Sequence, residues 1–132
     1  MIGIVIVAHG GLAREYLSAI EHEVGKQPGI VAVTIEADHD RAGKQAEICT
    51  VANDVDTGDG VVVVTDLYGG SPSNLSLLAC QPENRRILYG MNLPMLIKLA
   101  KSRQKDVPDA VKGALEAGRK YIDSVNVKPE PL

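Results

Sequence analysis

Four short runs of apolar, mostly β-branched residues constrain the fold more than any other feature of the chain. The runs cover residues 2–8, 30–35, 60–65 and 86–90. Continuous apolar runs, unlike runs in which polar and apolar residues alternate, are typical of strands that are buried on both faces of a parallel sheet. The sequence therefore predicts a sheet that is covered by other elements on both sides.

The segments between these runs read as helices. An apolar stripe over residues 12–20 predicts the first helix, and a weaker stripe over residues 42–51 predicts the second. At positions 71–72 a Ser that can act as N-cap precedes a Pro that fits the first helical position, which predicts a third helix. Two more helices are expected, one after Pro94 and one after residues 107–109.

Alternating strands and helices predict an open, doubly wound α/β fold. Crossovers between parallel strands are right-handed, so helices on opposite faces force the second crossover back over the first strand. We expect a mainly parallel sheet in the order 2-1-3-4, with a switch point between the first and third strands. The chain of 132 residues is expected to form one domain, 1–132, and residues 123–127 are expected to add a last edge strand.

Composition narrows the classes of partner and location. Without Phe or Trp, the core must be built from Val, Ile, Leu and Ala. The net charge of -3 and the lack of a concentrated basic patch argue against nucleic acid or an anionic membrane, but allow a basic protein partner. The apolar amino terminus is too short for a membrane span and has no basic leader, which favours a cytoplasmic protein.

Cys49 and Cys80 lack CxxC spacing and read as buried, reduced thiols.

Two residues that could carry chemistry follow neighbouring strands of the predicted sheet. His9 ends the first apolar run, and Asp66 follows the third. Ligands of doubly wound sheets bind at the carboxyl ends of the strands near the switch point, so the two side chains are expected to meet there. A carboxylate fixes one imidazole nitrogen as donor and leaves the other as a nucleophile toward phosphorus or as a base. In the alternative interpretation, His9 only ends a strand and Asp66 only caps a loop.

A glycine-rich loop follows Asp66. Gly69 and Gly70 allow the backbone to approach an anion closely, and Ser71 adds a hydroxyl group. Taken singly, the GGSP sequence indicates a tight turn and a helix cap. Together with His9 and Asp66 at the same edge, it suggests a site that handles phosphoryl groups, in which Gly69, Gly70 and Ser71 bind the phosphoryl oxygens.

Further residues near these motifs have weaker signals. Leu67 and Tyr68 are apolar residues at the mouth of the predicted site, as expected for docking of a protein partner. His22 reads as a solvated helical residue, and His39 as a loop residue beside an aspartate helix cap rather than a metal ligand. For Asn92, turn chemistry and a catalytic role both stay open.

Three motifs carry a resemblance to a known family. The sequences AHG around His9, TDLYGGSPSN at 65–74 and GMNLPML at 90–96 resemble the enzyme IIA component of the mannose-family, phosphoenolpyruvate-dependent sugar phosphotransferase system. Order and spacing match over essentially the whole chain. The resemblance implies a mainly parallel doubly wound sheet and a homodimer in which an edge strand near the carboxyl end is exchanged between subunits.

The resemblance also implies a role as a phosphohistidine relay that needs no cofactor and no metal. His9 stands where the family's histidine accepts a phosphoryl group from the phosphocarrier HPr and passes it to an enzyme IIB component. Asp66 stands where the family's aspartate orients the imidazole, and Ser71 where a loop serine lies near the phosphoryl group. A membrane would be involved only indirectly, through transporter components.

Three alternatives remain beside a sugar-transport role. The chain stops without the linker into a IIB domain that many relatives have, so a stand-alone IIA protein is expected, in sugar uptake or in a regulatory relay. The phosphoryl-transfer subunit of dihydroxyacetone kinase is similar as well. The competing hypothesis is a non-catalytic, flavodoxin-like binding module for a phosphate-containing ligand. It predicts a longer loop after the first strand and aromatic walls, whereas only Gly10 and Gly11 follow His9, and Tyr68 is the sole nearby aromatic residue.

Overall fold

The sheet has the predicted strand order. A computed structural model describes residues 1–67 and 69–129. Its sheet has the order β2-β1-β3-β4, and each neighbouring pair is parallel. The switch point therefore lies where predicted, between the first and third strands. The strands are β1 (Gly3–His9), β2 (Ile30–Ile35), β3 (Val61–Thr65) and β4 (Arg85–Leu88).

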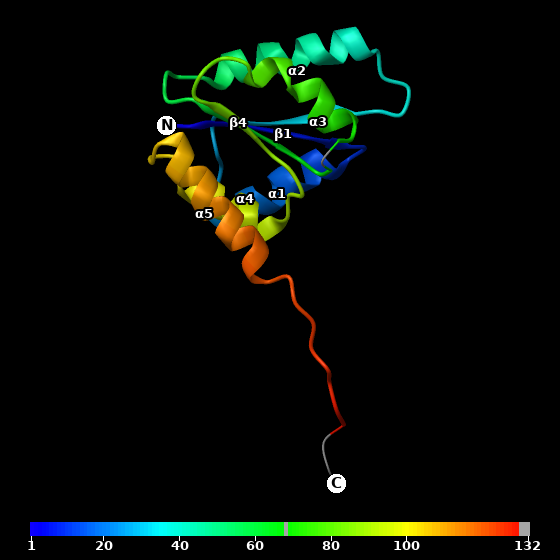
Figure 1. The fold of residues 1–132 in the computed structure, drawn as a ribbon, viewed down its shortest axis with the longest axis vertical. Helices are drawn as coiled ribbons and strands as arrows, with labels where there is room; N and C mark the ends of the chain where they lie inside the picture. Colours follow the sequence, from blue (N-terminus) through cyan, green and yellow to red (C-terminus); the bar gives the residue numbers. More distant parts are fainter. Residues whose placement is uncertain (68, 130–132) are drawn as a thin grey trace.

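Helices cover both faces of this sheet, as Figure 1 shows. One face carries α2 (Arg41–Val55), α3 (Ser71–Ser76) and the short 3-10 helix η1 (Leu78–Cys80). The other face carries α1 (Leu12–Val24), α4 (Leu93–Lys101) and α5 (Val107–Lys120). None of the helices in the described ranges is long and apolar enough to cross a membrane.

The central strands supply side chains to two separate cores. Ile4 and Ile6 belong to the cluster that packs against α1, α4 and α5, whereas Val5 and Val7 belong to the cluster under α2 and α3. All four side chains are buried. Successive residues of a strand point to opposite faces, so burial of both faces requires an unbroken apolar run. This is why these strands show no alternation in the sequence.

Polar caps place two helices slightly earlier than the apolar patterns predict. Asn92 caps α4, because its side-chain oxygen accepts the amide N–H of Met95 at 3.0 Å. The Nδ2 group of Asn92 donates to the carbonyl of Gly118 at 2.7 Å, which connects α4 to α5. Asp106 caps α5 in the same way. The bonds of Asn92 give it a structural function at the start of α4.

Some expected features of α2 and the thiols differ in detail. The helix buries Ile48, Ala52 and Val55. Residues 42 and 46 are exposed, so the prediction that they belong to the buried stripe is wrong. Cys49 and Cys80 are free thiols and only partly buried. Burial nevertheless raises the pKa of Cys80 to about 11, which keeps this thiol protonated and unreactive at neutral pH.

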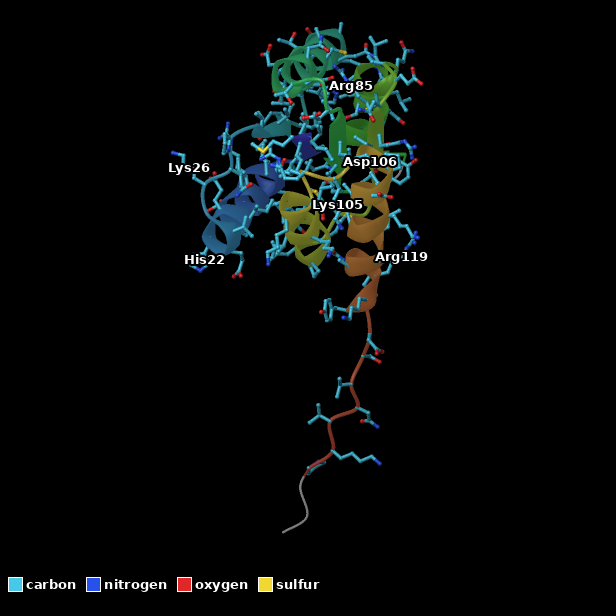
Figure 2. All side chains as sticks on the ribbon, turned by 90° about the vertical axis from the view of Figure 1, so that its left-hand side faces the viewer. His22, Lys26, Arg85, Lys105, Asp106 and Arg119 are labelled. Atoms are coloured by element: carbon cyan, nitrogen blue, oxygen red, sulfur yellow. The ribbon has the colours of Figure 1, made fainter. Side chains whose placement is uncertain are left out.

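The carboxyl-terminal tail does not extend the sheet of its own chain. After α5, residues 122–129 form no strand and run away from the body of the molecule (Figures 1 and 2). The apolar side chains of Ile122, Val125 and Val127 are 74% to 83% exposed. The expectation of an edge strand within the chain's own sheet is therefore wrong, because α5 ends away from the strand edges and leaves the tail without a neighbouring strand.

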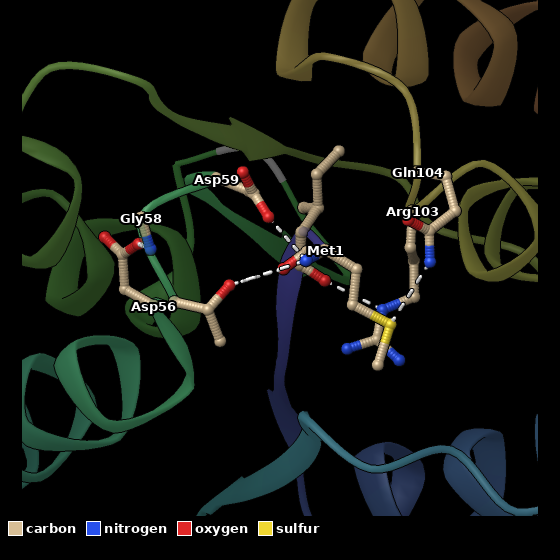
Figure 3. A network of polar contacts seen from close by, with 8 residues as sticks. Met1, Asp56, Gly58, Asp59, Arg103 and Gln104 are labelled. Carbon is tan, nitrogen blue, oxygen red and sulfur yellow. Dashed lines mark hydrogen bonds and ion pairs between the residues drawn. The ribbon is translucent and has the colours of Figure 1, made fainter.

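Arg103 joins distant parts of the chain at the edge of the sheet opposite the carboxyl ends of the strands. Its side chain is buried, and Nε donates to the carbonyl of Ile2 at 2.7 Å, while Nη1 donates to Oε1 of Gln27 at 3.4 Å. The amide of Ile2 donates back to the carbonyl of Arg103. Figure 3 shows Arg103 beside Met1 at the start of the chain. A single buried side chain thus connects the start of β1 with the segment between α4 and α5.

Candidate active site

His9 and Asp66 form the predicted pair. His9 is the last residue of β1, and Asp66 follows the last residue of β3, the parallel neighbour of β1. His9 Nδ1 lies 2.8 Å from Asp66 Oδ2. The same oxygen accepts the backbone N–H of His9 at 3.0 Å. Two bonds to one carboxylate oxygen fix the position of the residue and the angle of its ring.

The pair assigns different tasks to the two ring nitrogens. An ionised carboxylate can only accept, so Nδ1 is the donor and carries the proton. Within residues 1–67 and 69–129, no hydrogen bond to Nε2 of His9 is found. The His9 side chain is 48% exposed, whereas that of Asp66 is 14% exposed. The imidazole therefore presents a lone pair at the surface while its orienting partner is shielded.

The environment of Asp66 favours its charged form. Burial acts to raise the pKa of the carboxyl, but the hydrogen bonds from the His9 amide and ring, together with their charge attraction, outweigh burial. The pKa of Asp66 lies below its ordinary value as a result. The other oxygen, Oδ1, is buried without a hydrogen-bond partner among the described residues. Both hydrogen bonds between Asp66 and His9 therefore use Oδ2.

The glycine loop lies against the imidazole. Gly69 has φ +77, a left-handed conformation that favours glycine. Asn74 donates from Nδ2 to the carbonyl of Gly69 at 3.3 Å and braces the loop. A Cβ on Gly70 would lie 3.6 Å from Cε1 of His9. The loop therefore packs directly beside the ring, as the shared sheet edge predicted.

The expected cap of α3 is wrong by one residue. The N-cap is Gly70, and Ser71 is the first residue of the helix, with no side-chain cap bond. Gly70 takes the extended conformation that a cap requires, with φ -81 and ψ 173. Ser71 instead lines the same cavity as His9.

A cavity of about 510 Å³ opens beside His9. The loop after β2 supplies Glu36 and His39 to its wall, neither of which sequence reasoning placed at the site. A signal for them existed, because β2 is the other neighbour of β1 in the predicted order and the residues after Ile35 must lie at the same edge. The lining residues are His9, Gly10, Ile35, Glu36, Ala37, His39 and Ser71.

Three predicted residues remain: Leu67 lies beside the pair, His22 lies away from it, and Tyr68 lies outside the described residues. Leu67, next to Asp66, is 57% exposed. Tyr68, the other residue predicted for partner docking, lies outside the described residues. His22 is exposed on the outer side of α1 (Figure 2), away from the carboxyl ends of the strands.

The fold and the site together define a class. A doubly wound parallel sheet presents at its switch point a histidine that a carboxylate orients, with a glycine loop beside it. Comparison with known proteins places the chain within this class. Residues 3–116 match the model of the family EIIA-man, described as the PTS system fructose IIA component, where PTS denotes the phosphotransferase system. The chain belongs to this family, which favours the relay over the flavodoxin-like alternative.

Individual relatives agree with this placement. The PTS system mannose-specific EIIAB component of Escherichia coli (strain K12) is 28% identical over 131 residues, which are 97% of this chain and 41% of that protein. The chain thus spans about two fifths of the length of that relative. Among solved structures, the phosphotransferase system component EIIA from Streptococcus agalactiae is 28% identical, with a TM-score of 0.78 and coverage of 94% and 97% of the two chains.

A more distant structure confirms the fold. The mannose/sorbose specific IIA subunit from Enterococcus faecalis superposes with a TM-score of 0.85 over 98% of each chain, at 23% identity. The predicted sheet and its helical layers are therefore those of phosphotransferase-system IIA proteins.

Proposed function

We propose that this chain is a phosphohistidine carrier. His9 accepts a phosphoryl group from phospho-HPr and passes it to an enzyme IIB component, in sugar uptake or in a regulatory phosphorelay. The observation that carries the proposal is the 2.8 Å contact between His9 Nδ1 and Asp66 Oδ2, which leaves Nε2 as the reactive nitrogen. Membership of a phosphotransferase-system family supports the same chemistry. A cytoplasmic location, where HPr would meet the protein, belongs to this proposal.

The transfer step needs few protein groups. The lone pair of Nε2 attacks phosphorus, the bond from phosphorus to the donor nitrogen breaks, and its electron pair stays on the donor. No proton has to leave His9, because the Nδ1 proton stays in its bond to Asp66. The positive charge that develops on the ring is then stabilised by the carboxylate. In the second transfer, an acceptor residue of the IIB component attacks phosphorus, and the bond between phosphorus and Nε2 breaks. Its electron pair returns to Nε2, which regenerates His9.

The loop beside the ring is assigned to the phosphoryl oxygens. Gly70, which follows Gly69 in the loop, lies beside the His9 ring, and Ser71 lines its cavity. N–H and hydroxyl groups fixed before the reaction stabilise the transferring group without reorganisation. Such a site requires neither a metal nor a cofactor for the transfer.

Partner docking is assigned to the surface around the pair. The side chain of Leu67 is exposed beside Asp66, and Tyr68 is included from the sequence prediction. An apolar residue at the mouth of a site is typical of a protein contact. The net charge of -3 suits a basic docking face on the carrier.

Intact-mass measurement tests the proposal. The protein is incubated with phosphoenolpyruvate, enzyme I and HPr, alongside the variants His9→Ala, His22→Ala and His39→Ala. We expect one added phosphoryl group in the native chain, in His22→Ala and in His39→Ala, and none in His9→Ala. Labelling that persists in His9→Ala and disappears in another variant would overturn the assignment.

We also predict a homodimer, because the tail carries apolar side chains that the described part of its own chain leaves exposed. Ile122, Val125 and Val127 are exposed beyond α5, and pairing of this segment with the sheet of a second copy would bury them. Light scattering at micromolar concentration should give a dimer mass. Val125→Asp with Val127→Asp should shift the mass toward the monomer, whereas Lys128→Ala should not. A monomeric native chain would contradict the prediction.

A further inference from the structure

His39 faces the same cavity as the reactive histidine. The loop after β2 places its side chain in the wall that also contains His9 and Ser71. β2 and β3 flank β1 on opposite sides, so His39 and Asp66 come from opposite neighbours of the strand that carries His9. Asp66 binds Nδ1 of His9, whereas His39 lies in the wall of the cavity that opens beside His9.

The ring of His39 is held in one orientation. Its Nδ1 lies 2.8 Å from the carbonyl oxygen of Glu36, and its backbone N–H donates to the same oxygen at 3.3 Å. A carbonyl only accepts, so Nδ1 is the donor and Nε2 is the nitrogen that remains for another partner. His39 is half-buried. Helix capping does not explain the residue, because Asp40 caps α2 by accepting the N–H of Gly43.

Besides the histidines, the charged residues described at the cavity and beside His39 in the chain are acidic. Glu36 lies in the same wall as His39, and the carboxylate of Asp66 lies behind His9. Asp38 and Asp40 flank His39 in the chain. The described lining of the cavity includes no Lys or Arg. A phosphoryl group on His9 would add further negative charge to this acidic edge, and an imidazole can gain a proton near neutral pH to balance it.

We propose that His39, once protonated, donates an Nε2–H hydrogen bond to the phosphoryl group carried by His9. The inference rests on the proposed function of His9. It makes His39 a phosphoryl-binding residue whose proton strengthens the hold on the group: a lower pH favours the loaded carrier, and loss of the proton favours release. No covalent bond to His39 forms at any stage.

The variant His39→Asn separates this role from bracing of the loop. The Asn side-chain amide can still donate to the carbonyl of Glu36, but it lacks the second nitrogen. His39→Lys restores a positive charge without the ring. His22→Asn is the matched control, because His22 is an exposed histidine away from the cavity.

The experiment measures the equilibrium for phosphoryl exchange with HPr, at about pH 6 and about pH 8.5, a range in which imidazoles change charge. Each variant is compared with the native chain at the same pH, so that the pH dependence of HPr cancels. We expect His39→Asn to lower the loaded fraction, expressed as an equilibrium constant, about fivefold at the lower pH and less than about twofold at the higher. His39→Lys should recover most of the loss, and His22→Asn should match the native chain.

Two results of the exchange experiment with HPr would overturn the inference. One is an equal effect of His39→Asn at both pH values, which would indicate a structural role, and the other is no effect at the lower pH. If HPr fails to load even the native chain, the proposed function is wrong. Phosphoramidate, a small phosphoryl donor, then replaces HPr, with the label located by tandem mass spectrometry. A shorter lifetime of phosphorylated His9 in His39→Asn at the lower pH alone would still support the inference, and an unchanged lifetime or no label on His9 would overturn it.

Discussion

Replacement of Asp66 by Ala is expected to slow phosphorylation of His9 by roughly two to three orders of magnitude. The variant removes the oxygen that accepts both the ring and the backbone N–H of His9. The imidazole can then rotate and exchange its tautomer, so the reactive lone pair is seldom aimed at the donor. Rapid-quench measurement of the rate with phospho-HPr checks this result.

The controls for Asp66 separate orientation from charge and from stability. Asp66→Asn keeps an acceptor oxygen but loses the charge, and we expect an intermediate rate. Asp54→Ala removes an exposed carboxylate of α2 and should leave the rate unchanged. A native rate in Asp66→Ala would remove this residue from the mechanism. The circular dichroism spectrum of Asp66→Ala should match the native one, because the pair lies at the rim of the sheet.

Acidification should weaken the same pair. The pKa of Asp66 is lower in the folded chain than in the unfolded chain. Its contribution to the free energy of unfolding is therefore complete above the unfolded value and is lost as the pH falls through the lowered, folded value. At neutral pH the carboxylate is charged, and the orientation of His9 is preserved.

Replacement of Arg103 by Met is expected to lower the free energy of unfolding by about 2 to 4 kcal/mol. The variant leaves the Ile2 carbonyl without its side-chain donor and removes the bond to Gln27. The guanidinium also packs tightly on the backbone, because a Cβ on Gly29 would lie 2.6 Å from Nη2. Chemical denaturation gives the free energy. Phosphorylation of the folded variant should stay native, because the network lies at the opposite edge from His9.

Lys105 provides the control for Arg103. It lies two positions further along the chain, but its side chain is exposed. Lys105→Met should change the free energy of unfolding by no more than about 0.5 kcal/mol. Equal effects of the two substitutions would show that the hydrogen bonds of Arg103 add nothing to stability.

The strands could be predicted because their burial is visible in the sequence. Val61 to Val64 fill both cores, and only an unbroken apolar run can do so. The prediction was less accurate at β4, which covers Arg85–Leu88 rather than residues 86–90. Only Leu88 is buried there, so the apolar pattern is short and its ends are poorly marked. Gly90, with φ +67, lies beyond the strand, where the chain turns away from the sheet.

The site was partly predictable for a similar reason. The strand order predicts that residues ending β1 and β3 meet, and His9 and Asp66 do so. The strand order also places Glu36 and His39 at this edge, whereas the turn closed by the carbonyl of Glu36 sets the orientation of the His39 ring. Ser71 was wrongly assigned as a cap because Ser and Gly both serve at this position, and the backbone decides between them.

The tail could not be predicted from one chain. Its apolar residues resemble those of an edge strand, but a strand needs a neighbouring strand to which it can bond. Residues 122–129 have no such neighbour within the described part of their own chain. The sequence pattern gives the tendency to pair, whereas the partner in the proposed dimer belongs to another copy.

The position of the phosphoryl group on the imidazole tests the relay most directly. The native chain is loaded by phosphoenolpyruvate, enzyme I and HPr with isotope-labelled histidine, and NMR then identifies the nitrogen that is bonded to phosphorus. We expect a single acid-labile, base-stable phosphoryl group on Nε2 of His9, because Asp66 holds the proton of Nδ1. A phosphoryl group on Nδ1 of His9, or on His22 or His39, would contradict a relay in which Asp66 orients His9.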